Sequence, residues 1–192
     1  MISTLIKTLT ASNDASLSFV NGASDVVLDG TYDEYMFVFT DMDSADDSIH
    51  WTFGASVDAG SNYNVDLTTT VVLAIHNEAD DSASLGYITT QDLAVGSETT
   101  GGGGAQDYQW ISYNGGNAAD ESTSGILHLY SPNTAAVANL WHCTCVSNSA
   151  DAYERQDFTS GFFHTTADID AVQFKINSGN IAAGTIQMYG IS

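Results

Sequence analysis

Apolar and polar side chains alternate along this chain over short runs that Gly, Asn, Asp and Ser separate. A period of two is typical of β-strands. The strongest run is EYMFVFTDM, residues 34–42, where one face carries Tyr35, Phe37 and Phe39. The other face carries Met36, Val38 and Thr40. Because both faces are largely apolar, this pattern predicts a central strand buried on both sides.

The stretch DAVQFKINSGNIAAGTIQMYGI, residues 170–191, alternates on both sides of a turn-forming NSGN segment at 177–180. Gly and Asn supply the positive φ angles and local hydrogen bonds that turns need. We therefore expect its two halves to pair as a hairpin that closes a sheet. The apolar positions expected to be buried are Val172, Phe174, Ile176, Ile186 and Met188.

Similar runs elsewhere bring the count to about ten to twelve strands. They lie at residues 2–10, 17–20, 26–28, 51–56, 67–75, 107–113, 124–130, 137–146 and 158–164. The run at 51–56 is less apolar, and its Thr52, Gly54 and Ser56 predict one solvent-facing side. One helical turn is expected at 89–95 and a glycine-rich loop at 96–105. The pattern indicates an all-β protein with one domain, 1–192, folded as an antiparallel two-sheet β-sandwich of jelly-roll-like type.

The charge balance narrows the classes of partner. The chain has 24 acidic residues against 3 Lys and Arg, a formal net charge of −21. Such a surface repels nucleic acid and anionic membranes, so neither is an expected partner. No run is apolar enough for membrane insertion, and the start MISTLIKTLTAS does not read as a secretory signal.

Candidate chemistry is sparse in the sequence. Asp41, Asp43, Asp46 and Asp47 follow the strongest strand, but they do not fit an EF-hand, so we interpret them as a solvated loop and expect no metal. Cys143 and Cys145 are the only cysteines, and we expect them to be free and buried. The five histidines form no ligand motif, and we expect neither catalytic residues nor a cofactor. A carboxylate pair for glycoside hydrolysis has no spacing signature, so that alternative stays open.

Aromatic residues beside loops are the best candidates for a contact surface. Tyr108, Trp110 and Tyr113 follow the glycine-rich loop, and Tyr63 lies between asparagines in GSNYN. Exposed aromatic side chains of this kind stack on sugars or anchor protein contacts. The alternative for each is an ordinary place in the core of the sandwich.

Three segments resemble a group of uncharacterised proteins from marine tailed bacteriophages. They are LIKTLTASNDASLSFVNGASDVVLDGTYDEYMFVFTDM, the loop GSNYNV, and the stretch 170–191. The likeness weakens between residues 78 and 113. It implies a non-enzymatic structural protein displayed on the virion surface, made in the host cytoplasm. No functional residue can be carried over, because the family has no known site.

The resemblance leaves the role on the particle open. One reading is a tail-associated appendage or host-receptor-binding module, and the other is a decoration protein that cements the head shell. Both imply other virion proteins as partners and a homo-oligomer, with a trimer favoured, and the first implies a host-surface glycan or protein as receptor. A glycan-binding or glycan-cleaving module is the alternative of another class.

Overall fold

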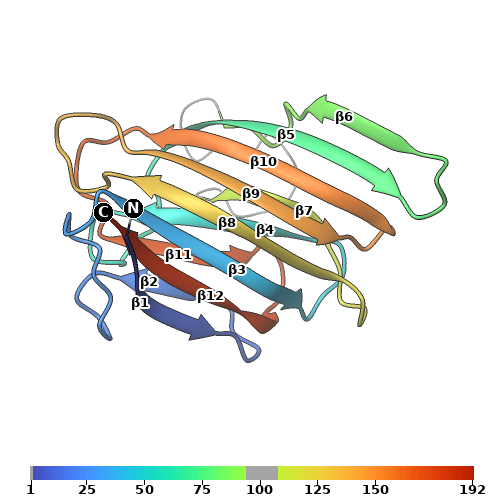
Figure 1. Ribbon diagram of the computed structural model, residues 1–192, viewed down its shortest axis with the longest axis horizontal. Coiled ribbons are helices and arrows are strands. Elements are labelled where there is room, and N and C mark those ends of the chain that lie inside the picture. The colour runs from blue at the N-terminus through green and yellow to red at the C-terminus, as the bar shows by residue number, and fades with distance from the viewer. Residues whose placement is uncertain (1, 94–107) are drawn as a thin grey trace.

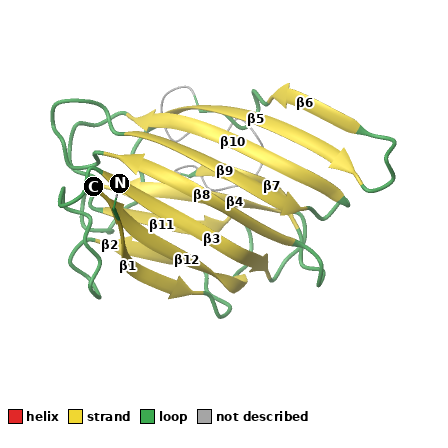
Figure 2. Ribbon diagram, in the orientation of Figure 1, coloured by secondary structure: helices red, strands yellow, loops and turns green. Residues whose placement is uncertain are grey.

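The computed structural model describes residues 2–93 and 108–192, which form two packed antiparallel sheets and no helix (Figure 2). The large sheet has eight strands in the order β1-β12-β3-β8-β9-β10-β5-β6, which cross Figure 1 in that sequence. Their bounds are β1 Ser3–Thr10, β12 Ile181–Ile191, β3 Glu34–Ser44, β8 Ser122–Tyr130, β9 Leu140–Asn148, β10 Tyr153–Phe163, β5 Leu67–Asn77 and β6 Ala83–Tyr87. The small sheet has four strands in the order β2-β11-β4-β7. Their bounds are β2 Leu17–Val20, β11 Ala171–Ile176, β4 Ile49–Ser56 and β7 Gln109–Gly115. The predicted two-sheet antiparallel sandwich is confirmed.

Four pairs of consecutive strands cross from one sheet to the other, and the pairs follow the same order in both sheets. β1 is followed by β2, β3 by β4, β7 by β8 and β11 by β12, with one member of each pair in each sheet. The order β1-β12-β3-β8 in the large sheet therefore matches the order β2-β11-β4-β7 in the small one. Four arches, each made of one strand from either sheet, thus build the sandwiched half of the molecule.

An aromatic cluster around Phe174 fills the space between the sheets. The Phe174 ring lies with its centroid 5.0 Å from Phe39, 5.4 Å from Phe37, 6.2 Å from Phe53 and 6.3 Å from Phe19. Phe37 and Phe39 come from β3, and Phe53 comes from β4. Tilted and edge-on contacts at these separations are the favourable geometry for aromatic pairs. Phe174 therefore joins both sheets at the centre of the core.

The predicted hairpin at 170–191 is wrong in its pairing, although its two strands exist. β11 pairs with β2 and β4, whereas β12 pairs with β1 and β3 in the other sheet. The NSGN segment is an arch turn, with Gly179 at φ 78° and Asn177 accepting a hydrogen bond from the His50 backbone N–H at 2.8 Å. The five predicted apolar side chains are buried as expected, but they face one another across the core.

Two predictions about buried faces also need correction. β3 lies between β12 and β8, and Tyr35, Phe37 and Phe39 point into the core. Its other side is the outer face of the large sheet, where Met36 and Val38 are only half-buried. β4 is the reverse case, because every residue from Ile49 to Ser56 is buried. On its expected solvent-facing side, Thr52 donates a hydrogen bond to the Lys175 carbonyl, and Ser56 is bonded to Asp58 and Gly60 of the following loop.

The remaining runs match strands except at 26–28, which is irregular although Val26 and Leu28 are buried. Cys143 and Cys145 are free and buried, as predicted. Of the helical turn expected at 89–95, residues 89–91 form a turn without a helix, and residues 94–95 lie outside the described residues, as does the glycine-rich loop expected at 96–105.

Candidate functional site

The four aromatic residues predicted as a contact surface form two ring pairs beside and within β7. Tyr63 and Tyr108 lie with ring centroids 6.5 Å apart, and the Lys175 ammonium sits 3.9 Å from the centre of the Tyr108 ring. Trp110 and Tyr113 are 5.8 Å apart. Tyr108 and Trp110 are buried, whereas Tyr63 and Tyr113 keep a partly exposed edge. Their role in contacts stays a prediction. Because Tyr108 and Trp110 are buried, only Tyr63 and Tyr113 can offer surface to a partner.

His50 of β4 contacts two of these rings. Its imidazole packs against both Trp110, at 3.9 Å, and Tyr113, at 4.5 Å, and its Nδ1 accepts a hydrogen bond from the Asn114 backbone N–H. Burial, and then the nearby charge of Arg155, lower the pKa of His50 to about 4. The ring is therefore neutral at pH 7 and packs against both aromatic rings.

Beside this stack, β10 places a charged pair between the sheets. Arg155 and Asp157 are both buried, and the Arg155 guanidinium lies 4.8 Å from the centre of the Tyr113 ring. Asp157 accepts a hydrogen bond from the Tyr113 backbone N–H at 3.3 Å. Burial raises the pKa of Asp157 to about 6, against the opposing effect of Arg155. These groups tie β7 to β10.

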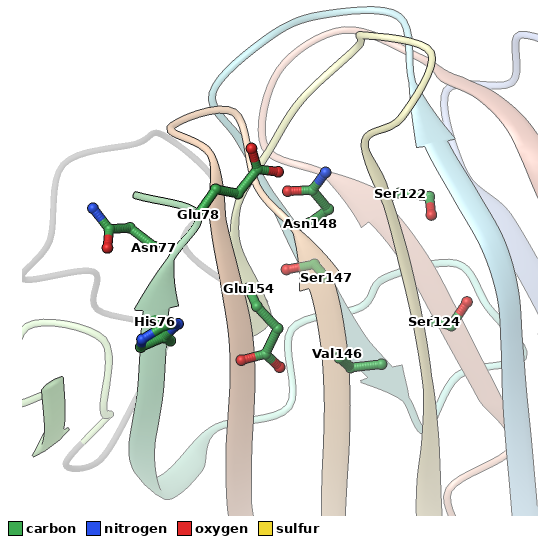
Figure 3. A pocket seen from close by; sticks show the side chains of 9 residues that line it. All are labelled: His76, Asn77, Glu78, Ser122, Ser124, Val146, Ser147, Asn148 and Glu154. Carbon is green, nitrogen blue, oxygen red and sulfur yellow. The ribbon is translucent and has the colours of Figure 1, made fainter. Parts of the chain in front are cut away.

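A different surface, the outer face of the large sheet, is hollowed over β8 and β9. The first depression, which we call the carboxylate hollow, has a volume of about 420 Å³ (Figure 3). It is lined by His76, Asn77, Glu78, Ser122, Ser124, Val146, Ser147, Asn148 and Glu154. Figure 3 shows Glu154 on β10 between the β5 side chains and those of β9.

The second depression, the imidazole hollow, also has a volume of about 420 Å³. It is lined by Val38, Phe39, Ser124, Gly125, Ile126, His128, His142, Thr144, Val146 and Gln156. Ser124 and Val146 line both depressions, so the two form one continuous surface, the outer groove. The groove thus crosses β3, β8, β9, β10 and the end of β5.

Three parallel rings stand at one side of the imidazole hollow. His128 of β8 is paired with His142 of β9, and their rings stack at 4.6 Å with an interplanar angle of 5°. Tyr130 lies 5.8 Å from His142 and nearly parallel to it. His128 Nδ1 bonds the Glu34 carboxylate, and His142 Nδ1 bonds the Tyr130 hydroxyl at 3.0 Å. Burial, and then the neighbouring His128, lowers the pKa of His142.

The outer groove is poor in charge although the protein is strongly acidic. Within the described residues, the acids that lie in strands are Glu34, Asp41, Asp43, Glu154 and Asp157. The others lie in loops at the rims of the sheets. None of the ten residues that line the imidazole hollow is acidic, Lys or Arg. Exposed apolar side chains, among them Val146 and Phe158, lie on this face instead.

The geometry offers no metal centre in residues 2–93 and 108–192, where no three His, Cys, Asp or Glu side chains converge on one point. The acidic residues at 41–47 do not form such a group. The stacked His128 and His142 are unsuited as a pair of ligands, because nitrogen lone pairs lie in the ring planes and parallel planes do not converge.

Sequence reasoning missed the outer groove. It found no ligand motif among the five histidines and assigned none of them to a site, whereas His128 and His142 come together here and each makes a local hydrogen bond. The available signal was the alternation of side chains in two strands. Ile126, His128 and Tyr130 share one face of β8, and His142 and Thr144 share one face of β9. Their apposition depends on strand register, which one sequence does not give.

Comparison with known proteins identifies no family for this chain, because no family model, curated protein or solved structure matches it. No helix capable of crossing a bilayer occurs in the described part of the chain.

Proposed function

We propose that this chain is a non-enzymatic structural protein of a bacteriophage virion, displayed on the particle surface as a tail-associated appendage or host-receptor-binding module. The resemblance of its two end regions to phage proteins supports the assignment. The outer face of the large sheet is the surface through which it makes contact. Its partners are other virion proteins and a receptor on the host surface, and the working unit is a homo-oligomer, with a trimer favoured.

The distribution of charge is the observation that carries this proposal. A net charge of −21 keeps a protein soluble and discourages indiscriminate association. Here most of the acids within the described residues lie in loops, and the face over β8 and β9 carries few charges and has exposed Ile126, Val146 and Phe158. Exposed apolar surface bounded by polar residues is typical of interaction sites. A protein with a structural and binding role fits this arrangement.

The test begins with purified particles of a phage whose genome encodes this chain. Mass spectrometry of washed virions is expected to detect the chain at a fixed number of copies per particle. A particle reconstruction then distinguishes a tail position from the alternative, a decoration protein on the head shell. Absence of the chain from washed particles would overturn the proposal.

A glycan-cleaving module is the second candidate, and one observation favours it. Glu78 and Glu154 both line the carboxylate hollow. Glycoside hydrolysis commonly uses two carboxyl groups on either side of the scissile bond. Release of reducing ends from host-surface polysaccharide, lost in both Glu78→Gln and Glu154→Gln, would establish cleavage. A purified protein that releases none, at any pH where it is folded, excludes this candidate for the substrates tested.

A further inference from the structure

We propose that the outer groove binds an uncharged, hydroxyl-rich oligosaccharide, with the imidazole hollow as the principal subsite. The inference deepens the proposed receptor-binding role by naming the class of ligand, and it rests on that role. It follows from the hydrogen-bonding groups, the charge and the size of the groove.

The two imidazoles present complementary groups to a ligand. Glu34 is a hydrogen-bond acceptor when ionised, so His128 donates from Nδ1 and its neutral form keeps an accepting Nε2. The Tyr130 hydroxyl occupies Nδ1 of His142, and when it donates there, Nε2 of His142 carries a proton to donate. Neither Nε2 atom has a partner among the described residues. An acceptor beside a donor matches a sugar hydroxyl, which both donates and accepts.

Other polar groups on the floor have the same character. Thr144 and Gln156 line the imidazole hollow and make no side-chain hydrogen bond within the described residues. Their hydroxyl and amide groups add both donors and acceptors. Val146 and Ile126 provide apolar surface between these groups. Mixed polar and apolar surface of this kind suits a sugar ring, which has hydroxyls at its edge and C–H groups on its faces.

Charge selects against the other classes of occupant. A net charge of −21 opposes anionic glycans, and it opposes a second copy of this chain laid face to face on the groove. A cationic ligand would find carboxylates, Glu78 and Glu154, only in the carboxylate hollow, because no acid lines the imidazole hollow and Glu34 beside it is bonded to His128. A neutral oligosaccharide is therefore the occupant that the groove favours.

The size of the groove fits such a ligand. Each hollow, at about 420 Å³, lies within the range of about 300–1,000 Å³ that is usual for small-molecule sites. Because Ser124 and Val146 line both, one extended ligand can occupy the two hollows together. The carboxylate hollow then supplies the Glu154 carboxylate and the Asn148 side-chain oxygen as further acceptors, whereas the Asn77 amide is engaged by Asp81 and Ser82.

The test uses the whole chain and a defined set of probes. Isothermal titration and amide shift perturbation are run with neutral tetrasaccharides of glucose, galactose and N-acetylglucosamine, and with sialyllactose and a heparin tetrasaccharide as anionic probes. At least one neutral probe is expected to bind and to shift the amides of β8 and β9. The anionic probes are expected to bind at least about tenfold more weakly.

Two variants locate the site. His142→Ala removes one of the proposed hydrogen-bonding groups, and Val146→Tyr fills the junction of the two hollows at an exposed strand position that accepts aromatic residues. Both are expected to weaken binding about tenfold or more. Leu85→Ala, on the same sheet face but outside both hollows, is expected to leave binding unchanged. Melting curves confirm that each variant is folded.

Several results would overturn the inference. These are failure of every neutral probe to bind at millimolar concentration, stronger binding of the anionic probes, or binding that both groove variants leave intact. Self-association abolished by Val146→Tyr would instead assign the groove to a second copy and would refute the glycan assignment. If the virion contains the chain but the groove binds no sugar, the proposed structural function stands and this inference alone fails.

Discussion

Two buried groups near β7 should give this protein opposing responses to pH, and separating them tests the packing around His50 and Asp157. The pKa of His50 falls from 6.5 to about 4 in the folded protein, while that of Asp157 rises from 3.8 to about 6. Each unit of pKa shift corresponds to about 1.4 kcal/mol, so each group contributes a change of ~3 kcal/mol across its range.

The signs are opposite. Between the two pKa values of His50, the unfolded chain binds a proton that the folded protein does not, so stability rises as the pH rises. Between those of Asp157, the folded protein holds a proton that the unfolded chain has lost, so stability falls as the pH rises. In the unaltered protein the two effects largely cancel between pH ~4 and ~6.5.

Replacing one group should reveal the pH dependence that the other group contributes to stability. We compare urea unfolding of the unaltered protein, His50→Gln and Asp157→Asn from pH ~4 to ~7, using tryptophan fluorescence. Relative to the unaltered protein, Asp157→Asn should gain ~3 kcal/mol in unfolding free energy over this range. His50→Gln should lose a similar amount. Taking differences removes the contribution of the other titrating groups and any constant cost of the substitution.

The reasoning fails if either difference is independent of pH or if both change in the same direction. A flat difference for His50→Gln would mean that the imidazole is not buried against Trp110 and Tyr113. A flat difference for Asp157→Asn would mean that water reaches the carboxyl group between the sheets.

Three further outcomes are expected. Phe174→Ala should lower the unfolding free energy by ~3–5 kcal/mol, because it empties the centre of the aromatic core, whereas Phe158→Ala on the exposed face should cost much less in the same urea titration. Cys143 and Cys145, with Sγ atoms 3.6 Å apart and burial raising the pKa of Cys143, should resist iodoacetamide in the native protein and react once it is unfolded; rapid native labelling would contradict their burial. A chelator should leave the melting temperature nearly unchanged, and a large decrease would reveal a structural cation at the 41–47 acids or elsewhere.

The alternation of side chains predicted the strands well because burial of one face imposes a period of two. It identified the core positions of β3, including Phe37 and Phe39, and the apolar residues of β11 and β12. It could not choose between a hairpin and an arch, since a turn such as NSGN serves both. The outer face of β4 was misjudged for a related reason: Thr52 and Ser56 look solvent-facing, but the Thr52 hydroxyl bonds the backbone of β11 and Ser56 bonds the loop that follows β4.

The candidate site was less accessible to prediction than the fold. Tyr63, Tyr108, Trp110 and Tyr113 do come together, but two of them are buried against the small sheet. The outer groove depends on the pairing of His128 with His142, which belong to different strands. Long-range register of this kind is fixed by the whole sheet, so local sequence patterns do not contain it.

The arch made of β11 and β12 has a consequence for how the protein is synthesised. These two strands are made after all the others, yet each inserts between partners made much earlier: β12 between β1 and β3, and β11 between β2 and β4. On the ribosome, β1 and β2 must wait without their sheet neighbours until β12 and β11 have emerged. Pairing of distant segments is slow, and exposed strand edges promote aggregation in the meantime. Yield of this protein should therefore depend on chaperones and growth temperature more than its native stability alone would suggest.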